Sequence, residues 1–199
     1  WLLLRPALPR IGGRLGAWRV HRALKRSLPA SHYSVFRDIG SRPSQARGQP
    51  SARIDHVVVS PYGVFVIEAR HSPGRISGSK RDALWTRSCF RSKQQFRNPL
   101  SQARDHALVL QDLTGLNASR FHPVVVFTGR VEFEQPMPAR VTQLGGLVPF
   151  IQVRTQDLLG FDEAERVAAL LESSRVPPGI QTAAAHLAAL DYLVGGGET

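Results

Sequence analysis

The spacing of apolar residues along the chain predicts where its first elements lie. Between residues 14 and 28 apolar positions recur at helical spacing and Pro29 follows, which predicts an N-terminal helix. The segment 33–39 alternates with the period of a strand. Residues 41–52 are rich in proline, glycine and serine, and we expect a loop there.

The next segment has the pattern of a β-hairpin. RIDHVVVS (53–60) and VFVIEAR (64–70) are two apolar runs of strand length. The turn between them carries Pro61 and Gly63 at positions that favour a tight reversal. The second run is unusual because Glu68 and Arg70 stand within an otherwise apolar strand.

The rest of the chain alternates between predicted strands and helices. We expect a polar loop over 71–82, a strand over 84–90 and a helix from Asn98-Pro99 to Gly115. Trp85 and Phe90 on this strand are expected to pack in the core or at a sheet edge, with stacking on nucleic-acid bases as the alternative. The apolar run 123–129 predicts a strand buried on both faces. Residues 131–149 look irregular, 151–153 could form a short last strand, and helices are expected over 162–173 and 180–194. This order indicates a single α/β domain.

The hairpin pattern brings two carboxylates together. If the turn closes symmetrically, paired residues have numbers that sum to 123, so Asp55 faces Glu68 on one face of the hairpin. A divalent cation would relieve their repulsion, since carboxylate oxygens are preferred ligands of Mg²⁺. The same pairing sets Arg53 opposite Arg70, so a self-neutralising quartet of salt bridges is the alternative. A slip of one residue in the register would remove both interpretations.

Charge gives the chain a predicted class of partner. It has 26 Lys and Arg against 15 Asp and Glu, a formal charge of +11. Such a balance favours a polyanion, with nucleic acid before anionic lipid. Basic residues are dense between Arg70 and Arg104, where Asp82 is the only acid. This stripe could bind backbone phosphates, or it could be a solvated face; its members are Arg70, Arg75, Lys80, Arg81, Arg87, Arg91, Lys93, Arg97 and Arg104.

Other kinds of chemistry find little support in the sequence. The single cysteine, Cys89, excludes an intrachain disulfide and a cysteine-based zinc site. The histidines lack the spacing of metal ligands, and neither a hydrolase triad motif nor a nucleotide-binding glycine loop is present. No apolar run reaches the length of about 18 residues that spans a bilayer.

Several of these segments together resemble the nuclease-related domain family, a branch of the PD-(D/E)xK, restriction-endonuclease-like superfamily. The resemblance is carried by RIDHVVVSPYGVFVIEAR (53–70), Trp85, NPLSQARDH (98–106) and HPVVVFTG (122–129), and it covers roughly residues 12 to 160. It implies a mixed central β-sheet flanked by helices, with additional C-terminal helices, and a Mg²⁺- or Mn²⁺-dependent hydrolase that cleaves DNA or, as an alternative, RNA.

The resemblance also assigns roles to individual residues. Asp55 and Glu68 match the two acidic metal ligands, with the Ala69 carbonyl as a third candidate. Arg70 stands where the family usually has a catalytic lysine. Gln102 matches a glutamine of the following helix, and His106, one turn later on the same face, falls where a related exonuclease branch has a tyrosine.

Two departures bear on catalysis. The family commonly has Gly-Glu in the first helix, where this chain has Gly16-Ala17. Arg70 keeps a positive charge but stays protonated, so it cannot act as a general base. The alternatives to an active nuclease are therefore a catalytically inactive nucleic-acid-binding module and a protein-interaction domain, whose terminal helices could pack on a partner or form a homodimer.

The expected organisation is an N-terminal extension (1–11), a nuclease-related domain (12–160) and a helical extension packed on it (161–199). We expect nucleic acid, and DNA in the first place, as the partner, with Arg53 and the basic stripe as its contacts. A cytoplasmic location is expected for this segment. Because the chain begins with Trp1 rather than methionine, an upstream membrane anchor stays an open alternative.

Overall fold

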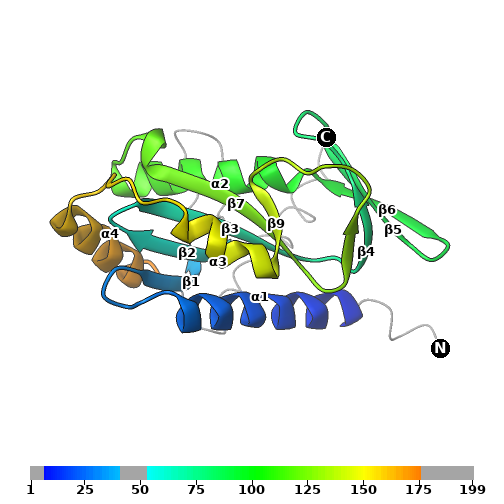
Figure 1. The fold of residues 1–199 in the computed structure, drawn as a ribbon, viewed down its shortest axis with the longest axis horizontal. Coiled ribbons are helices and arrows are strands. Elements are labelled where there is room, and N and C mark those ends of the chain that lie inside the picture. Colours follow the sequence, from blue (N-terminus) through cyan, green and yellow to red (C-terminus); the bar gives the residue numbers. More distant parts are fainter. Residues whose placement is uncertain (1–6, 41–52, 176–199) are drawn as a thin grey trace, which may run out of the picture.

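The computed structural model describes residues 7–40 and 53–175, which form a mixed α/β fold with two sheets (Figure 1). The elements in chain order are α1 (Ala7–Ser27), β1 (Ser34–Gly40), β2 (Arg53–Ser60), β3 (Gly63–His71), β4 (Gly74–Ser77), β5 (Leu84–Cys89), β6 (Ser92–Arg97), α2 (Pro99–Thr114), the 3₁₀ turn η2 (Ala118–Arg120), β7 (Phe121–Thr128), β8 (Val131–Phe133), β9 (Val141–Gln143), α3 (Leu144–Gln152) and α4 (Phe161–Ser173).

The main sheet has the strand order β1-β2-β3-β7-β9. β1, β2 and β3 pair antiparallel, whereas β3 pairs parallel with β7 and β7 with β9. The β3 to β7 connection passes through α2, as a parallel pair requires. Helices cover both faces, with α1 and α2 on opposite sides of the sheet (Figure 1), so the expectation of a mixed central sheet flanked by helices is confirmed.

Alternation along β2 and β3 divides the main core into two layers. Val57, Val59, Val64 and Val66 pack with α2 and α4, whose buried residues in this layer include Leu110 and Leu171. The intervening positions, such as Phe65 and Ile67, face α1 and α3. β7 is buried on both faces, as its continuous apolar run predicts. By the same alternation, Glu68 and Arg70 lie on the face covered by α2.

The second sheet, in the order β6-β5-β4-β8, differs in part from the expected elements. β5 forms as expected, but the predicted loop over 71–82 is wrong, because Gly74–Ser77 forms β4 between β5 and β8. Trp85 is fully buried and stacks on Phe127 of β7 at a centroid distance of 6.2 Å. This stacking joins the two sheets. Gly78 has a φ of 151°, and a Cβ there would lie 2.3 Å from the Trp85 ring, so only glycine fits.

The segment after β7 is also more regular than its sequence suggests. Residues expected to be irregular form β8, β9 and the start of α3, and Ile151 and Gln152 belong to α3 rather than to a last strand. α3 contains two glycines and Pro149, which hide its helical character. Its Leu147 and Ile151 are nevertheless buried against the sheet.

The predicted helix boundaries around α2 are confirmed. Asn98 caps α2 by accepting a hydrogen bond from the Leu100 N–H at 2.9 Å, and Pro99 occupies the first turn. Gly115 ends α2 in the left-handed conformation. The Asn98 amide also donates to the carbonyls of Ser79 and Asp82, which ties the start of α2 to the β4–β5 loop.

Several large apolar side chains are more exposed than their sequence pattern predicts. Phe90 was expected in the core or at a sheet edge, but it is fully exposed at the tip of the β5–β6 hairpin. Leu15 and Trp18 belong to the predicted apolar stripe of the first helix, yet both are about half exposed.

Two predicted terminal or connecting segments, the loop at 41–52 and the helix at 180–194, lie outside the described residues. None of the helices in the described part of the chain has the length and apolar character needed to cross a membrane.

Candidate functional site

The predicted hairpin register is confirmed up to the acidic pair. β2 and β3 pair from Ser60 opposite Gly63 to His56 opposite Ile67, all with numbers that sum to 123. Regular pairing stops there. Where it would set Ala69 opposite Ile54, the Ala69 N–H instead donates to Asp55 Oδ2 at 3.4 Å. The Asp55 side chain therefore lies between β2 and β3 where their regular pairing has ended, beside Glu68.

Glu68 is the most buried acid of the site, with 3% of its side chain exposed. Two basic groups approach it: Arg70 Nε lies 3.9 Å from Oε1, and His106 Nδ1 of α2 lies 3.4 Å from Oε2. Neither contact has hydrogen-bond geometry. Among the described residues, Glu68 Oε2, Arg70 Nε and His106 Nδ1 are all buried polar atoms that lack a hydrogen-bond partner.

Burial dominates the electrostatics of the pair. Loss of solvent and the neighbouring Asp55 raise the pKa of Glu68 to about 8, against the opposing effect of Arg70. Burial also raises the pKa of Asp55, although the Ala69 N–H and Arg53 act in the other direction. Burial lowers the pKa of His106. The contact between Glu68 and His106 is therefore one between neutral groups near pH 7 rather than an ion pair.

Arg70 is held by an aromatic ring of the second sheet. Its guanidinium carbon lies 5.4 Å from the centroid of Phe96 on β6, a cation–π distance. The side chain remains 29% exposed, so it borders solvent while it faces Glu68. The spacing of apolar residues did not indicate a role for Phe96, because this residue lies in the polar segment SKQQFR.

The predicted quartet of salt bridges does not form as a unit. Arg53 makes a short ion pair with Asp38 of β1, which sequence reasoning did not foresee. Asp38 has a φ of 56°, an uncommon conformation that interrupts the pairing of β1 with β2 beside Asp55. Of the predicted quartet, the pair that remains in contact is Arg70 with Glu68, at 3.9 Å between Nε and Oε1.

The remaining candidates lie on the helices around the pair. Gln102 is half-buried on α2, one turn before His106. Gly16 of α1 lies against the ends of β3 and β7, where a Cβ would meet Thr128 Oγ1 at 2.4 Å. Ala17, where the family commonly has a glutamate, is half-buried beside it and offers no ligand atom on its side chain.

The donor set suits a hard cation with open coordination positions. Within residues 7–40 and 53–175, no group of three or more His, Cys, Asp or Glu side chains is arranged so that it could hold a metal ion. Two carboxyls with raised pKa values and an unpaired Glu68 Oε2 still match the partial protein ligation that Mg²⁺ accepts, in which water and phosphate oxygens complete the shell.

The basic residues fall into separate places rather than one stripe. Arg97 pairs with Asp105 of α2, and Arg75 pairs with Glu134. The others lie on the second sheet, its loops and the exposed side of α2; they are Lys80, Arg81, Arg87, Arg91, Lys93 and Arg104. Arg53 stands apart, at the start of β2. Most of these cations therefore surround the second sheet rather than the acidic pair.

The raised pKa of Glu68 predicts a pH dependence of stability in the metal-free protein. Between the ordinary pKa of 4.5 and the raised pKa of about 8, Glu68 keeps its proton in the folded state but releases it in the unfolded chain. Its contribution to the free energy of unfolding is therefore fully present below pH 4.5 and is lost as the pH rises through about 8. Glu68→Gln, which stays neutral, should remove this loss of up to about 5 kcal/mol. Urea unfolding in EDTA between pH 4 and 9 measures it, and parallel profiles for both proteins would contradict the assignment.

Relatives of the chain share the segment that holds the acidic pair. The family model described as "Nuclease-related domain" matches residues 12–128. An uncharacterized protein of Bacillus anthracis is 31% identical over 131 residues, which are 61% of this chain and 58% of the relative. The chain thus spans somewhat more than half the length of that relative. No solved structure matches. The family match covers the acidic hairpin, α2 and β7, and the chain therefore belongs to the nuclease-related domain family.

Proposed function

We propose that the protein is a metal-dependent nuclease that hydrolyses phosphodiester bonds of DNA at Asp55 and Glu68. The observation that carries this proposal is the convergence of two carboxyls in a desolvated position where Glu68 Oε2 has no hydrogen-bond partner among the described residues. Burying two such groups side by side costs free energy. A site for a cation accounts for that cost, and the membership of the nuclease-related family supports it.

Asp55 and Glu68 would hold Mg²⁺ or Mn²⁺. The bound ion would supply an activated water and neutralise negative charge on the phosphate. The Ala69 N–H fixes the orientation of Asp55 through its hydrogen bond to Oδ2. His106 lies beside the other carboxyl and acts as a positioning residue, because its Nδ1–H can donate to Glu68 once Glu68 is ionised.

Arg70 is the group of this chain best placed to bind the substrate phosphate. Its guanidinium borders solvent, faces Glu68 and rests on Phe96. A guanidinium can donate two hydrogen bonds to phosphate oxygens and stabilise charge that develops there. It cannot remove a proton from water. Gln102, on the same side of α2 as His106, is proposed to orient the attacking water.

The excess of basic residues on and around the second sheet supports DNA as the partner. Those of the interval 70–104 are accompanied by one acid, Asp82. Lys and Arg that contact phosphates give binding without base readout. A nucleic-acid-binding module without cleavage is the second candidate. Arg70 and Ala17 favour it, because each replaces a residue that could assist catalysis.

Metal binding tests the proposal and separates the two candidates. Mg²⁺ or Mn²⁺ at ten times its Kd should stabilise the wild type by about 1.4 kcal/mol, which raises Tm by about 3–5 °C. Asp55→Asn should remove the shift, and Asp157→Asn, an exposed acid before α4, should retain it. Differential scanning fluorimetry in matched salt measures both. Salt-sensitive DNA binding with no metal effect would instead support the binding module.

A further inference from the structure

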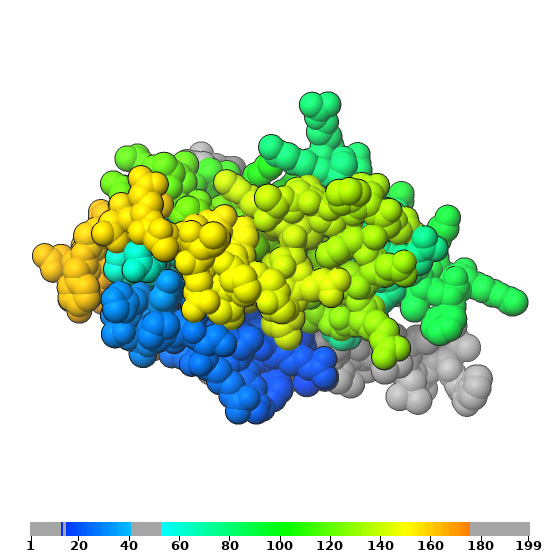
Figure 2. Space-filling model, viewed as in Figure 1, coloured from blue at the N-terminus to red at the C-terminus, as the bar shows by residue number. Residues whose placement is uncertain are grey.

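We infer that the β5–β6 hairpin is a binding arm for single-stranded DNA, in which Phe90 stacks on an unpaired base and Lys93 and Arg91 contact the backbone. The inference rests on the proposed function for its substrate class. It adds a strand preference that the acidic pair alone does not give. Figure 2 shows the hairpin, coloured green, projecting from the body of the molecule.

The turn at the tip places Phe90 where packing cannot explain it. Cys89 pairs with Ser92, so Phe90 and Arg91 form a two-residue loop. Phe90 has a φ of 52°, a conformation that favours glycine at the first position of such a turn. Its ring is fully exposed and makes no ring contact within the described chain. An unpacked aromatic ring, carried by a strained backbone turn at a projecting tip, is available to stack on a ligand.

The register of the second sheet gives the arm two different faces. Cross-strand pairing puts Ile76 beside Arg87 and Trp85 beside Phe96, so this inner face packs on the core and on Arg70. The alternate positions form an outer face that is mostly polar, with Leu84 as the large apolar residue on it. These positions are Arg75, Ser77, Leu84, Thr86, Ser88, Lys93, Gln95 and Arg97.

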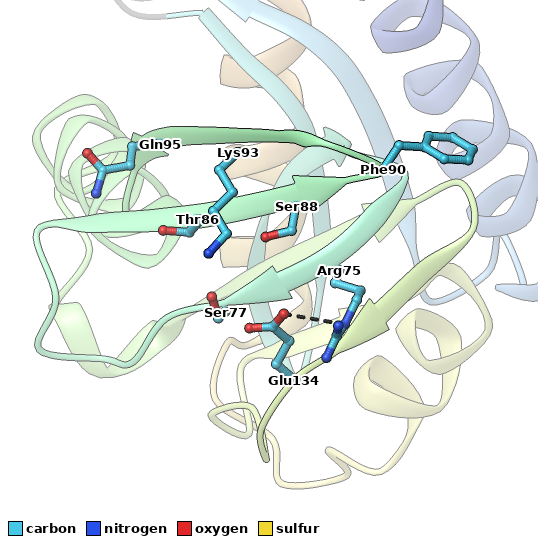
Figure 3. Close-up of a pocket in the computed structure, with 8 residues that line it drawn as sticks. All are labelled: Arg75, Ser77, Thr86, Ser88, Phe90, Lys93, Gln95 and Glu134. Carbon is cyan, nitrogen blue, oxygen red and sulfur yellow. Dashed lines mark ion pairs between the residues drawn. The ribbon is translucent and has the colours of Figure 1, made fainter.

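The outer face lines an open pocket of about 800 Å³, together with Phe90 and Glu134. Figure 3 shows the Lys93 side chain extending between Thr86 and Ser88, with Phe90 at the end of the hairpin. Arg75 is engaged by Glu134 at 3.3 Å. In the described part of the chain, Lys93 and Arg91 form no ion pair, so both are available to phosphates.

The exposed Phe90 ring should favour binding of a single strand over binding of a duplex. In a duplex the faces of the bases are covered by their neighbours, whereas an unpaired base can stack on an exposed aromatic side chain. Lys93 and Arg91 would contact phosphates of either form. Phe90 should therefore determine the preference between the two forms, and the cations should determine the salt dependence.

The test measures binding without metal, so that cleavage does not intervene. Fluorescence anisotropy in EDTA compares labelled oligothymidylate with a duplex of equal length. Phe90→Gly should weaken binding of the single strand about 5- to 100-fold and change duplex binding by less than about twofold. Glycine suits the turn, so the variant should be at least as stable as the wild type. Phe90→Trp should keep the preference. Phe161→Ala, which removes another exposed ring, is the matched control.

Three outcomes would overturn the arm. The first is an equal loss of affinity for single strand and duplex in Phe90→Gly, and the second is no loss of affinity for the single strand in that variant. The third is a wild type that binds oligouridylate tightly and does not prefer oligothymidylate to the duplex. Cleavage and binding by the wild type separate this inference from the nuclease proposal. A wild type that prefers the single strand but does not cut it with Mg²⁺ or Mn²⁺ counts against the metal site alone, whereas a wild type that cuts but shows no strand preference counts against the arm alone.

Discussion

Glu68→Gln should lower the rate of Mg²⁺- or Mn²⁺-dependent DNA cleavage by about 10²-fold or more. The substitution keeps the shape of the side chain and removes the charge that would bind a cation in the most desolvated part of the site. Loss of about 3 kcal/mol of transition-state stabilisation corresponds to that factor. Because the buried side chain is neutral in the metal-free protein, the fold should tolerate glutamine.

The measurement is cleavage of labelled linear and circular DNA with saturating metal, and the protein is compared at equal folded fraction. Glu165→Gln, an exposed acid on α4, is the matched control and should cut at the wild-type rate. A Glu68→Gln protein that cuts as fast as the wild type would exclude this carboxyl from the reaction. Binding of DNA by that inactive variant should persist, since the cations lie elsewhere.

Trp85→Ala should lower the free energy of unfolding by about 3–5 kcal/mol. Trp85 is fully buried, stacks on Phe127 of the main sheet and donates from Nε1 to the Ser79 carbonyl at 2.9 Å. Its removal leaves a cavity between the two sheets and takes one of two hydrogen bonds from the Ser79 carbonyl, which keeps the one from the Asn98 amide. Phe96 would also lose the ring against which it packs at a centroid distance of 6.5 Å. Arg70, which lies over Phe96, would lose that support in turn.

Urea unfolding at pH 7 measures this loss, with Leu84→Ala as the control. Leu84 precedes Trp85 on β5 and is about half exposed, so its truncation should cost much less than 1 kcal/mol. A Trp85→Ala protein as stable as Leu84→Ala would contradict the packing of the second sheet on the main sheet.

Much of the main sheet was predictable because its signals are local. The valine-rich strands, the turn at Pro61 and the cap at Asn98 each depend on a few neighbouring residues. The hairpin register follows from the turn, and this register is enough to predict that Asp55 lies beside Glu68. The position of His106 near Glu68 was indicated only by the family resemblance, since a helix face alone does not say which carboxyl it meets.

The second sheet was harder to predict because its strands have no continuous apolar run. SKQQFR forms β6 with one half-buried residue, Phe96, and its other five side chains exposed. β4 has one fully buried residue, Ile76, which a polar loop could equally contain. Such strands form because tertiary partners complete their hydrogen bonds. The pairing of Arg53 with Asp38 likewise depends on a strand that is distant in sequence.

The Ser79 carbonyl has a mechanical consequence for the site. It accepts hydrogen bonds from both Trp85 Nε1 and the Asn98 amide, at 2.9 and 3.3 Å. The second sheet, which carries Phe96, and α2, which carries His106, are thereby cross-linked through one oxygen. Phe96, which holds Arg70, and His106, which lies beside Glu68, therefore belong to elements that are anchored to the same loop carbonyl.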